Sequence, residues 1–419
     1  MRRDKNMDKK QEIQDEVQLI QDLFDGIDNG DFNNFGETSD KYTFKYLKAI
    51  WDLQTVLDGG KELYKQIYEI AIKCGIRHVQ QKYKTGRKIK VAFLTISAAE
   101  WPAESVYRLL KMNENVEAYL VVGPLIDRSV ENMEDAFEKT ASFFEKRGYD
   151  VRRAYDSKNK KVRLWEEIGK PDIVIHLTHW YKSLPEEYQI ENYPFTILNC
   201  YIPYAMSLAD NAKGTFMINS SNNSMFLNMM WHIYTDTMYH YEGYREYQLL
   251  GGENVVFTGF PKMDFFYNKI ENTSDQLMLM ANWKYPTGCD PKNMKKVIIA
   301  PHHTFLGYGG ILYSTFQWNM YFWIYLAKKY ENQISFIFKP HPNLRTRAIE
   351  AEVFRDAGDY ERYIDLWEKL PNARVSAEES YLEIFATSDG MIMDSNSFLA
   401  EYMYVNLSLI HISEPTRPE

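Results

Sequence analysis

A histidine between two prolines directly follows an apolar run in FIFKPHPNLR, residues 336–345. Proline fixes its own φ and biases the residue before it towards extended backbone, so we expect a strand to end here and His341 to be held rigidly. Lys339 and Arg345 flank it and can compensate phosphate charge. Because a catalytic group gains most when it is held near its reacting atom, His341 is the first catalytic candidate. The alternative is a rigid turn with a solvated histidine.

Two further segments of the C-terminal half also follow apolar runs. GFPKMD (259–264) places Lys262 in a Gly-Pro turn where it can face a ligand, although a turn that ends a strand explains this segment equally well. APHHTFLGYGG (300–310) offers adjacent histidines that point in different directions, so we expect one of them, His302 or His303, to face a ligand. The sequence shows no C-x-x-C or H-E-x-x-H pattern beside them, and we predict no metal site.

A polar turn and a helix follow the apolar run MIM in SDGMIMDSNSFLAE, residues 388–401. Amides and hydroxyls at the start of a helix bind phosphate, which makes Ser395, Asn396 and Ser397 candidates for a phosphate site. Glu401 lies about one turn inside the predicted helix, where it can reach a ribose hydroxyl. The alternative is an ordinary helix cap followed by a surface carboxylate.

The N-terminal half contains a second group of polar and aromatic candidates. IHLTHWYKSLP offers His176 and His179, and LNCYIPYA offers Tyr201 and Tyr204. A histidine inside a strand is more often a hydrogen-bonded core residue than a catalyst, which favours His179, in the loop after the strand, over His176.

Parallel strands would bring these loops together, and the order of apolar and helical segments in the sequence predicts such strands. Apolar strand-like runs alternate with helical stretches from IKVAFLTI onward, as in βαβ units. We therefore expect an α/β chain with two Rossmann-like domains. The sequence has no G-x-G-x-x-G after the first strand, which argues against nicotinamide or flavin chemistry. The expected division is a helical segment over 1–86, a first domain over 87–250 that ends in a helix at 225–249, and a second domain over 251–406 that opens with the strand NVVFTG.

The composition is that of a soluble globular protein, and the cysteine content is that of a protein in a reducing compartment. The net charge of −9 argues against a surface that binds nucleic acid, while a local cationic site for phosphate remains compatible with it. Three widely spaced cysteines form no disulfide framework. With no signal peptide or spanning segment in the sequence, we expect a cytoplasmic protein, with peripheral contact at the inner face of the membrane as an open alternative. The basic stretch 82–90 is expected to be a solvated linker.

Taken together, GFPKMD, APHHT, FKPHP and SDGMIMDSNSFLAE resemble, in this order, the CDP-glycerol glycerophosphotransferase family, which builds teichoic acid and related polymers. The resemblance covers roughly residues 90–406 and implies a GT-B fold with an acceptor domain and a nucleotide-donor domain. By this resemblance His341 lies beside the donor pyrophosphate, while Asn396 and Ser397 hold phosphate. Asp394 would orient that turn.

The activity implied by the resemblance is transfer of glycerol phosphate, or a related polyol phosphate, from a CDP-linked donor to a hydroxyl. The acceptor would be a lipid-linked or polymeric polyol phosphate, CMP would leave, and no cofactor is expected beyond the nucleotide donor. The chain departs from the family in two places: NCYIPYA stands where a His-Gly element is usual, and PHHT replaces a Pro-Thr-Trp-Arg-like element. The general base and the acceptor are therefore open.

Two alternatives of different kinds remain from the sequence. One is another GT-B enzyme, either a nucleotide-sugar glycosyltransferase or an enzyme like UDP-N-acetylglucosamine 2-epimerase, since the epimerase pattern also has an Asp-Ser turn followed by a glutamate. The other is a non-catalytic scaffold for a polymer-assembly complex, because the usual first-domain histidine is missing.

The end of the chain, LSLIHISEPTRPE (407–419), resembles the translated read-through of a sequencing adapter. We therefore expect residues 407–419 to be a non-native tail and the second domain to be truncated, with no functional role for His411. The alternative is a final strand LSLIHIS with a polar tail.

Overall fold

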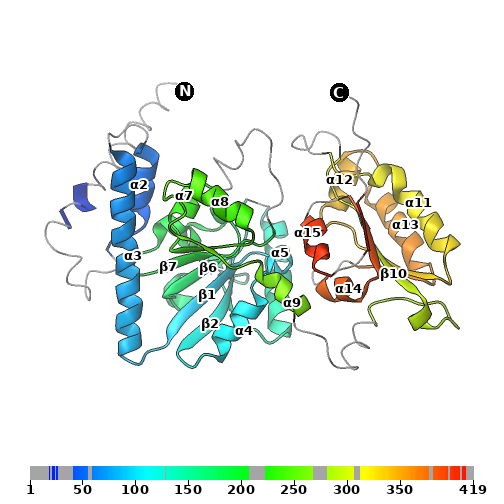
Figure 1. Ribbon diagram of the computed structural model, residues 1–419, viewed down its shortest axis with the longest axis horizontal. Coiled ribbons are helices and arrows are strands. Elements are labelled where there is room, and N and C mark those ends of the chain that lie inside the picture. Colours follow the sequence, from blue (N-terminus) through cyan, green and yellow to red (C-terminus); the bar gives the residue numbers. More distant parts are fainter. Residues whose placement is uncertain are drawn as a thin grey trace, which may run out of the picture. The chain divides into compact units, whose positions relative to one another are not determined.

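The chain divides into two compact units, Met1–Lys262 (unit 1) and Met263–Glu419 (unit 2), in a computed structural model (Figure 1). Each unit carries its own parallel sheet, which confirms the predicted α/β class with two Rossmann-like domains. The structure describes residues 18, 21–23, 25–26, 41–54, 59–127, 129–206, 222–267, 281–305, 312–376, 381–394, 397–405 and 408–411, the last four and residue 397 by backbone alone.

Unit 1 is built on a seven-stranded sheet in the order β3-β2-β1-β6-β7-β8-β9, with all neighbours parallel. Its central strands are apolar on both faces because both faces are covered. In β1, Ala92 and Leu94 pack into one hydrophobic cluster, and Val91 and Phe93 pack into the other. The strands are β1 (Ile89–Thr95), β2 (Val116–Val122), β3 (Val151–Arg153), β6 (Ile173–His176), β7 (Leu198–Tyr201), β8 (His232–Thr235) and β9 (Val255–Phe257), with a separate β4 (Tyr155–Asp156) and β5 (Lys161–Val162) pair.

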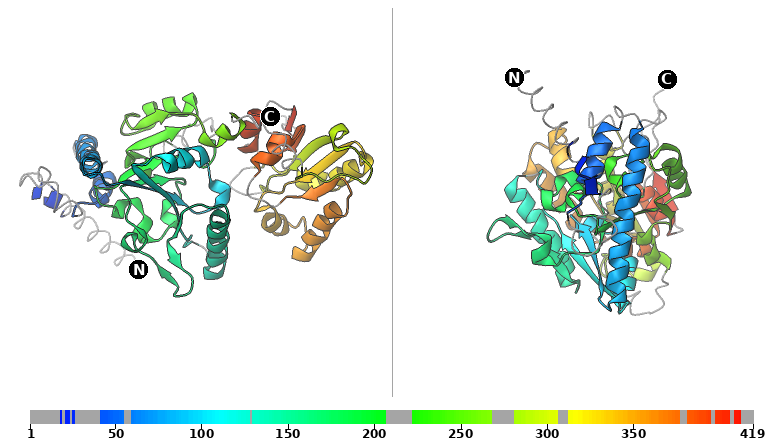
Figure 2. Two further views of the ribbon diagram at one scale, coloured as in Figure 1. Left: turned by 90° about the horizontal axis from the view of Figure 1, so that it is seen from below. Right: turned by 90° about the vertical axis from the view of Figure 1, so that its left-hand side faces the viewer.

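Helices cover the two faces of this sheet. α4 (Glu104–Met112) and α5 (Val130–Lys146) pack on the Phe93 side, while α2 (Lys45–Leu53) and the long α3 (Gly60–Lys84) pack on the other (Figure 2). A Cβ atom added to Gly75 of α3 would lie 2.5 Å from Cδ2 of Leu198 in β7, so glycine permits this close approach. Within the stretch expected to be helical, these two helices occupy Lys45–Leu53 and Gly60–Lys84.

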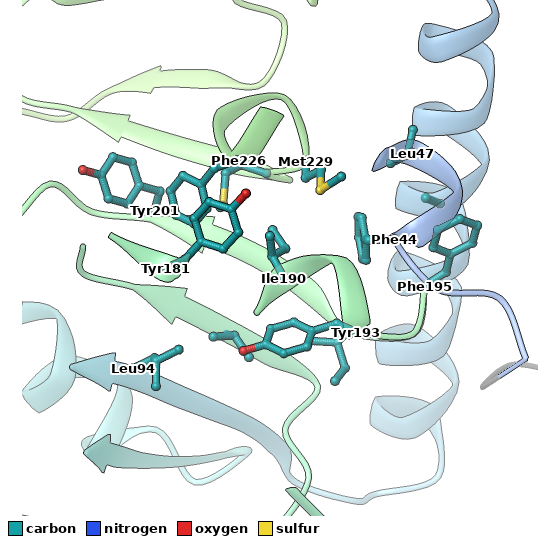
Figure 3. Close-up of a cluster of buried hydrophobic side chains, with 14 of the residues drawn as sticks. Phe44, Leu47, Leu94, Tyr181, Ile190, Tyr193, Phe195, Tyr201, Phe226 and Met229 are labelled. Carbon is teal, nitrogen blue, oxygen red and sulfur yellow. The ribbon is translucent and has the colours of Figure 1, made fainter. Parts of the chain in front are cut away.

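Aromatic rings fill much of the core on the α3 side of unit 1 (Figure 3). The rings of Tyr181 and Phe226 stack with their centroids 5.0 Å apart, and Phe195 meets Phe44 edge-on at 5.4 Å. Such pairs stabilise a core beyond the area that they bury. Part of the high aromatic content of the chain is therefore core rather than ligand-binding surface.

The border between the units differs from the sequence-based expectation. Residues 225–249 contain two helices around a strand, in the order α7 (Met225–Asn228), β8 and α8 (Met238–Tyr247), instead of one helix. β9 pairs with β8, so NVVFTG closes the first sheet rather than opening the second. The short strand HIYT was hidden because its apolar residues continue the three- and four-residue spacing of the helices around it. Unit 1 accordingly extends to Lys262 instead of Leu250.

Unit 2 is built on a five-stranded parallel sheet in the order β12-β11-β10-β13-β14. Ile299, Phe336 and Phe338 pack against α11, α12 and α13, whereas Ile298 and Ile337 pack against α14 and α15. The elements are α9 (Asp264–Tyr267), β10 (Lys295–Ala300), α11 (Phe316–Lys329), β11 (Ile334–Phe338), α12 (Leu344–Glu350), α13 (Ala357–Glu368), β12 (Ala373–Val375), α14 (Leu382–Thr387), β13 (Gly390–Met393), α15 (Ser397–Met403) and β14 (Ser408–His411).

The backbone of residues 408–411 forms strand β14, which pairs with β13 so that Ser408 lies opposite Gly390. For these four residues the structure agrees with the alternative of a final strand, and residues 412–419 of the expected non-native tail lie outside the described residues. Among the helices that the structure describes, none combines the length and the apolar character needed to cross a membrane.

Candidate functional site

Three polar loops of unit 2 meet at one edge because β11, β10 and β13 are neighbours and run parallel. His302 and His303 follow β10, His341 follows β11, and Asp394 follows β13. The N–H of His341 donates to the carbonyl of Pro301 at 3.3 Å, which joins the first two loops. The carboxyl ends of parallel strands are where α/β proteins usually bind ligands.

The three histidines form one cluster at this edge. The rings of His303 and His341 stack with centroids 3.9 Å apart, and the ring of His302 lies 5.2 Å from that of His341. His302 and His303 are themselves 4.3 Å apart. The expectation that a single member of the His302–His303 pair faces the site is therefore wrong: the loop after β10 turns so that both rings contact His341.

Burial keeps these imidazoles neutral at pH 7. Desolvation lowers the pKa of His341 to about 3, and His303, His302 and Lys339 add smaller effects in the same direction. Desolvation, followed by the neighbouring His303, lowers the pKa of His302 to about 4. The pKa of His303 is also lowered, first by burial and then by Arg347.

Two of the imidazoles are held in a defined tautomer. The N–H of Asn343 donates to Nδ1 of His341 at 3.1 Å, and the N–H of Thr304 donates to Nδ1 of His302 at 3.3 Å. A neutral imidazole that accepts at Nδ1 carries its proton on Nε2. His341 and His302 therefore present Nε2–H groups, which suit the oxygens of a phosphate.

One nitrogen of each histidine lies within 4.8 Å of the others, a spacing that is also compatible with a shared metal ion. Metal binding through Nε2 would move the proton to Nδ1, where it would meet the backbone N–H of Asn343 or Thr304. Two cationic side chains, Lys339 and Arg347, also act on the cluster. The N–H groups of the cluster and the cations beside it thus fit an anion better than a metal cation. The absence of a metal stays a prediction.

Asp394 is buried, with 2% of its surface exposed, and holds two other segments in place. Its Oδ1 accepts the N–H of His302 at 2.5 Å. Its Oδ2 accepts the N–H of Thr315 at 2.6 Å and the Thr315 hydroxyl at 3.1 Å. The structure therefore makes Asp394 a positioning residue for the histidine loop and for the start of α11.

Lys339 and Glu401 belong to a buried network around Tyr381. The Lys339 ammonium lies 5.6 Å from the centroid of the Tyr381 ring, and the Tyr381 hydroxyl donates to Oε2 of Glu401. Burial, followed by Glu401, raises the pKa of Tyr381 well above its usual value, so the hydroxyl stays protonated. Because Glu401 is 2% exposed and engaged with Tyr381, the structure places it in the interior of unit 2 instead of at a ribose site.

Arg347, not Arg345, is the arginine that acts on the histidine cluster. Arg345 has a side chain that is 52% exposed and forms an ion pair with Glu361 of α13 at 3.3 Å. Arg347 lowers the pKa of His303, as noted above, and pairs with Glu350 at 2.6 Å. The helical spacing contained this signal, because Arg347 shares the inner face of α12 with Leu344 whereas Arg345 does not.

The remaining predicted phosphate ligands are placed only in part. Ser395 and Asn396 lie outside the described residues, and Ser397 opens α15 with its side chain not described. Lys262 is the last residue of unit 1 and is buried, with 8% of its surface exposed. The phosphate-binding turn at 395–397 stays a prediction.

Unit 1 gathers a second set of candidates at the carboxyl edge of its own sheet. Nδ1 of His179, after β6, lies 3.5 Å from the hydroxyl of Tyr201, and the His179 ring stacks 6.2 Å from that of Tyr204. Trp180 is 53% exposed beside His179, with ring centroids 4.1 Å apart. Burial lowers the pKa of His179, so it is neutral and able to accept a proton.

Sequence reasoning missed the acidic members of this edge. Glu100 follows β1, and its carboxylate contributes, after burial, to the raised pKa of Tyr204. Burial is the first cause of the raised pKa of Tyr201, and Asp236, which follows β8, adds to it together with Glu100. Nothing in the local sequence marks either residue, because strand order alone brings them next to β6 and β7.

His176 is a core residue, in agreement with the sequence-based preference for His179. It is 1% exposed and its Nε2 lies 3.0 Å from Oδ1 of Asn199. Burial, opposed by this hydrogen bond, lowers the pKa of His176 to about 4.

Comparison with known proteins yields likenesses to solved structures alone. No protein-family model matches the sequence, and no curated protein does. UDP-GlcNAc 2-epimerase from Neisseria meningitidis is 16% identical over 78% of this chain and 83% of its own, with a TM-score of 0.41. The wall teichoic acid polymerase TagF is 12% identical over 84% of this chain and 77% of its own, with a TM-score of 0.47. At these identities the likeness concerns the fold, so the function has to be argued from the residues of this chain.

Proposed function

We propose that this chain is a transferase that binds a nucleotide-activated donor at the histidine cluster of unit 2. The observation that carries the proposal is the meeting of His302, His303 and His341 at one sheet edge, with two Nε2–H groups fixed by backbone hydrogen bonds. Preorganised donors of this kind stabilise the charge that develops on phosphate oxygens. Lys339 and Arg347 supply positive charge to the same place.

The sequence resemblance favours CDP-glycerol, or a related CDP-linked polyol phosphate, as the donor. An acceptor hydroxyl oxygen attacks the phosphorus linked to the polyol, the bond from that phosphorus to the CMP oxygen breaks, and the hydroxyl proton passes to a base. Transfer of this kind needs positioning, charge stabilisation and a proton acceptor, and no cofactor. The neutral His341, which offers an N–H, fits the charge-stabilising role rather than that of the base.

For the base we propose His179 of unit 1. If the Tyr201 hydroxyl accepts Nδ1–H of His179, then Nε2 carries the lone pair that takes the acceptor proton. The lowered pKa of His179 supports this role, because it leaves the imidazole unprotonated at neutral pH. Glu100 and Asp236 lie at the same edge and can hold acceptor hydroxyl groups.

The direct test measures CMP release from CDP-glycerol in the presence of a lipid-linked polyol acceptor. We expect turnover by the 419-residue chain and its loss in His341→Ala and His179→Asn. Retained turnover in EDTA would agree with the metal-free mechanism, whereas loss that magnesium restores would contradict it.

Binding measurements separate this proposal from the alternatives. Calorimetric titration with CDP-glycerol and with UDP-GlcNAc should show preference for the CDP-linked donor. Preference for UDP-GlcNAc would instead favour the glycosyltransferase or epimerase interpretation, and absence of binding to either nucleotide would favour a scaffold.

A further inference from the structure

Helix α11 of unit 2 (Phe316–Lys329) is apolar on two opposite faces. Its inner face packs into the core through Phe316, Met320, Trp323, Ile324 and Ala327. Its outer face carries Trp318, Tyr321, Phe322 and Tyr325, which are 61%, 64%, 52% and 55% exposed. A surface helix is normally polar on the side that faces water. We call these four residues the aromatic face of α11.

The aromatic face is continuous. Its residues occupy positions i, i+3, i+4 and i+7, which are adjacent on one side of an α-helix. Phe322 and Tyr325 stack with ring centroids 6.3 Å apart, and Tyr321 meets Tyr363 of α13 edge-on at 6.0 Å. Figure 1 shows α11 on the same side of the unit 2 sheet as α13. Contiguous exposed aromatic side chains mark contact surfaces, in contrast to apolar residues that are scattered singly.

The charge around this face is positive along the helix itself. The sequence FQWNMYFWIYLAKK contains no acidic residue and ends in Lys328 and Lys329. The Lys329 ammonium lies 5.9 Å from the centroid of the Tyr325 ring and 5.3 Å from that of Tyr330. Cations are thus placed at one end of the aromatic face.

We propose that the aromatic face of α11 rests in the headgroup region of a membrane that contains anionic lipid. Tyrosine and tryptophan favour this depth because their rings are apolar and their O–H and N–H tips need polar partners. Lysines beside such a face bind anionic headgroups. At 14 residues the helix is too short to span a bilayer, so it lies in the plane of the interface.

The polar tips distinguish a membrane from a protein partner. A protein surface that covered this face would have to pair the Trp318 N–H, the Tyr321 and Tyr325 hydroxyls and two ammonium groups individually. A layer of phosphate headgroups and water satisfies all of them at once. The inference does not depend on the proposed transferase activity, since it concerns a different surface of unit 2.

The test is cosedimentation of the 419-residue chain with vesicles of phosphatidylcholine, with and without phosphatidylglycerol. We expect binding that is stronger with phosphatidylglycerol and that weakens as salt screens the lysines. The variant Trp318→Ser/Phe322→Ser should lower the partition coefficient at least about tenfold. Lys328→Gln/Lys329→Gln should remove the preference for phosphatidylglycerol and leave the residual binding to phosphatidylcholine.

The matched control is Leu109→Ser/Met112→Ser on α4 of unit 1, where both side chains are exposed, at 64% and 75%. It removes comparable apolar surface elsewhere and should leave vesicle binding unchanged. Thermal melting of each variant confirms the fold, which these exposed positions should preserve. Failure to bind either vesicle, or equal loss in the α4 control, would overturn the proposal. So would a concentration-dependent dimer that Trp318→Ser/Phe322→Ser abolishes, because it would assign the face to a second copy of the chain.

Discussion

The imidazole of His341 stacks on that of His303 with ring centroids 3.9 Å apart, although the two residues follow different strands. The contact exists because β10 and β11 are parallel neighbours whose carboxyl ends coincide. It joins the loops after these two strands into one histidine cluster.

We predict that the cluster acts by donating hydrogen bonds. His341→Ala should weaken donor binding about tenfold to a hundredfold, the range for loss of a charge-assisted hydrogen bond. His341→Gln should recover part of this affinity, because its amide N–H can replace Nε2–H. Isothermal titration with CDP-glycerol measures both, and equal loss in the two variants would contradict a donor role.

The two arginines of α12 provide a matched pair for the same measurement. Arg347→Ala should weaken donor binding because it removes positive charge near His303. Arg345→Ala should have little effect, since Arg345 is exposed and pairs with Glu361. The reverse result would restore the ligand role that the sequence assigned to Arg345.

Acid should destabilise the protein through these histidines. Their pKa values lie below the usual value of about 6.5, so in this range the unfolded chain binds more protons than the folded one. Stability should therefore fall as the pH drops from about 6.5 towards the folded values of about 3 for His341 and about 4 for His302. His341→Gln should reduce this slope by up to about 1.4 kcal/mol per pH unit. Urea unfolding between these limits checks it, and an unchanged slope would count against a buried neutral His341.

Replacing Asp394 should destabilise unit 2. Asp394→Ala leaves the N–H groups of His302 and Thr315 without their acceptor, which costs about 2–4 kcal/mol. Asp365→Asn on the exposed side of α13 is the control and should stay within about 0.5 kcal/mol of the parent. Chemical denaturation gives both values, and equal stabilities would show that the carboxylate does not hold these segments.

In the stretch 82–90, predicted as a solvated linker, residues 83–88 are exposed, but Lys82 forms a buried ion pair in unit 1. Lys82 donates to both oxygens of Asp172 at 2.8 and 2.6 Å, and Asp172 is 3% exposed. Burial by itself would raise the pKa of Asp172, but hydrogen bonds from His78, Lys82 and the N–H of Lys90 outweigh it and hold the pKa below its usual value. This carboxylate therefore adds stability above about pH 4, which is lost as the pH falls further.

Removing the Lys82 side chain should leave the buried Asp172 carboxylate without its ion-pair partner. We expect Lys82→Ala to cost about 3–5 kcal/mol, because it leaves a buried carboxylate with fewer partners. Lys84→Ala, at an exposed position of the same helix, should cost less than about 1 kcal/mol and serves as the control. Urea denaturation at pH 7 compares them, and similar losses would mean that the pair contributes little.

The strands were predictable where apolar runs are continuous, as in IKVAFLTI and ISFIF, because a strand buried on both faces needs such a run. Strand β8 was not predictable, because HIYT is short and its apolar residues continue the spacing of the helices on either side. The loops that carry His303 and His341 were identified from the sequence, but their contact depends on strand order. Strand order likewise brings Glu100 and Asp236 to the edge of unit 1 that carries His179, and no local pattern marks them. Glu401 was expected to reach a ribose hydroxyl, and burial that no local pattern encodes places it in the interior instead.

The pairing of β9 with β8 has a consequence for how the chain is made. β8 buries Ile233 and Thr235, and on the side away from β7 it pairs with β9. During synthesis from the N-terminus, β8 remains the edge strand of the first sheet until residues 255–257 have left the ribosome. A nascent chain that stalls near residue 250 should therefore recruit chaperones or aggregate, whereas one released after residue 262 can cover β8 with β9, which is then the edge strand.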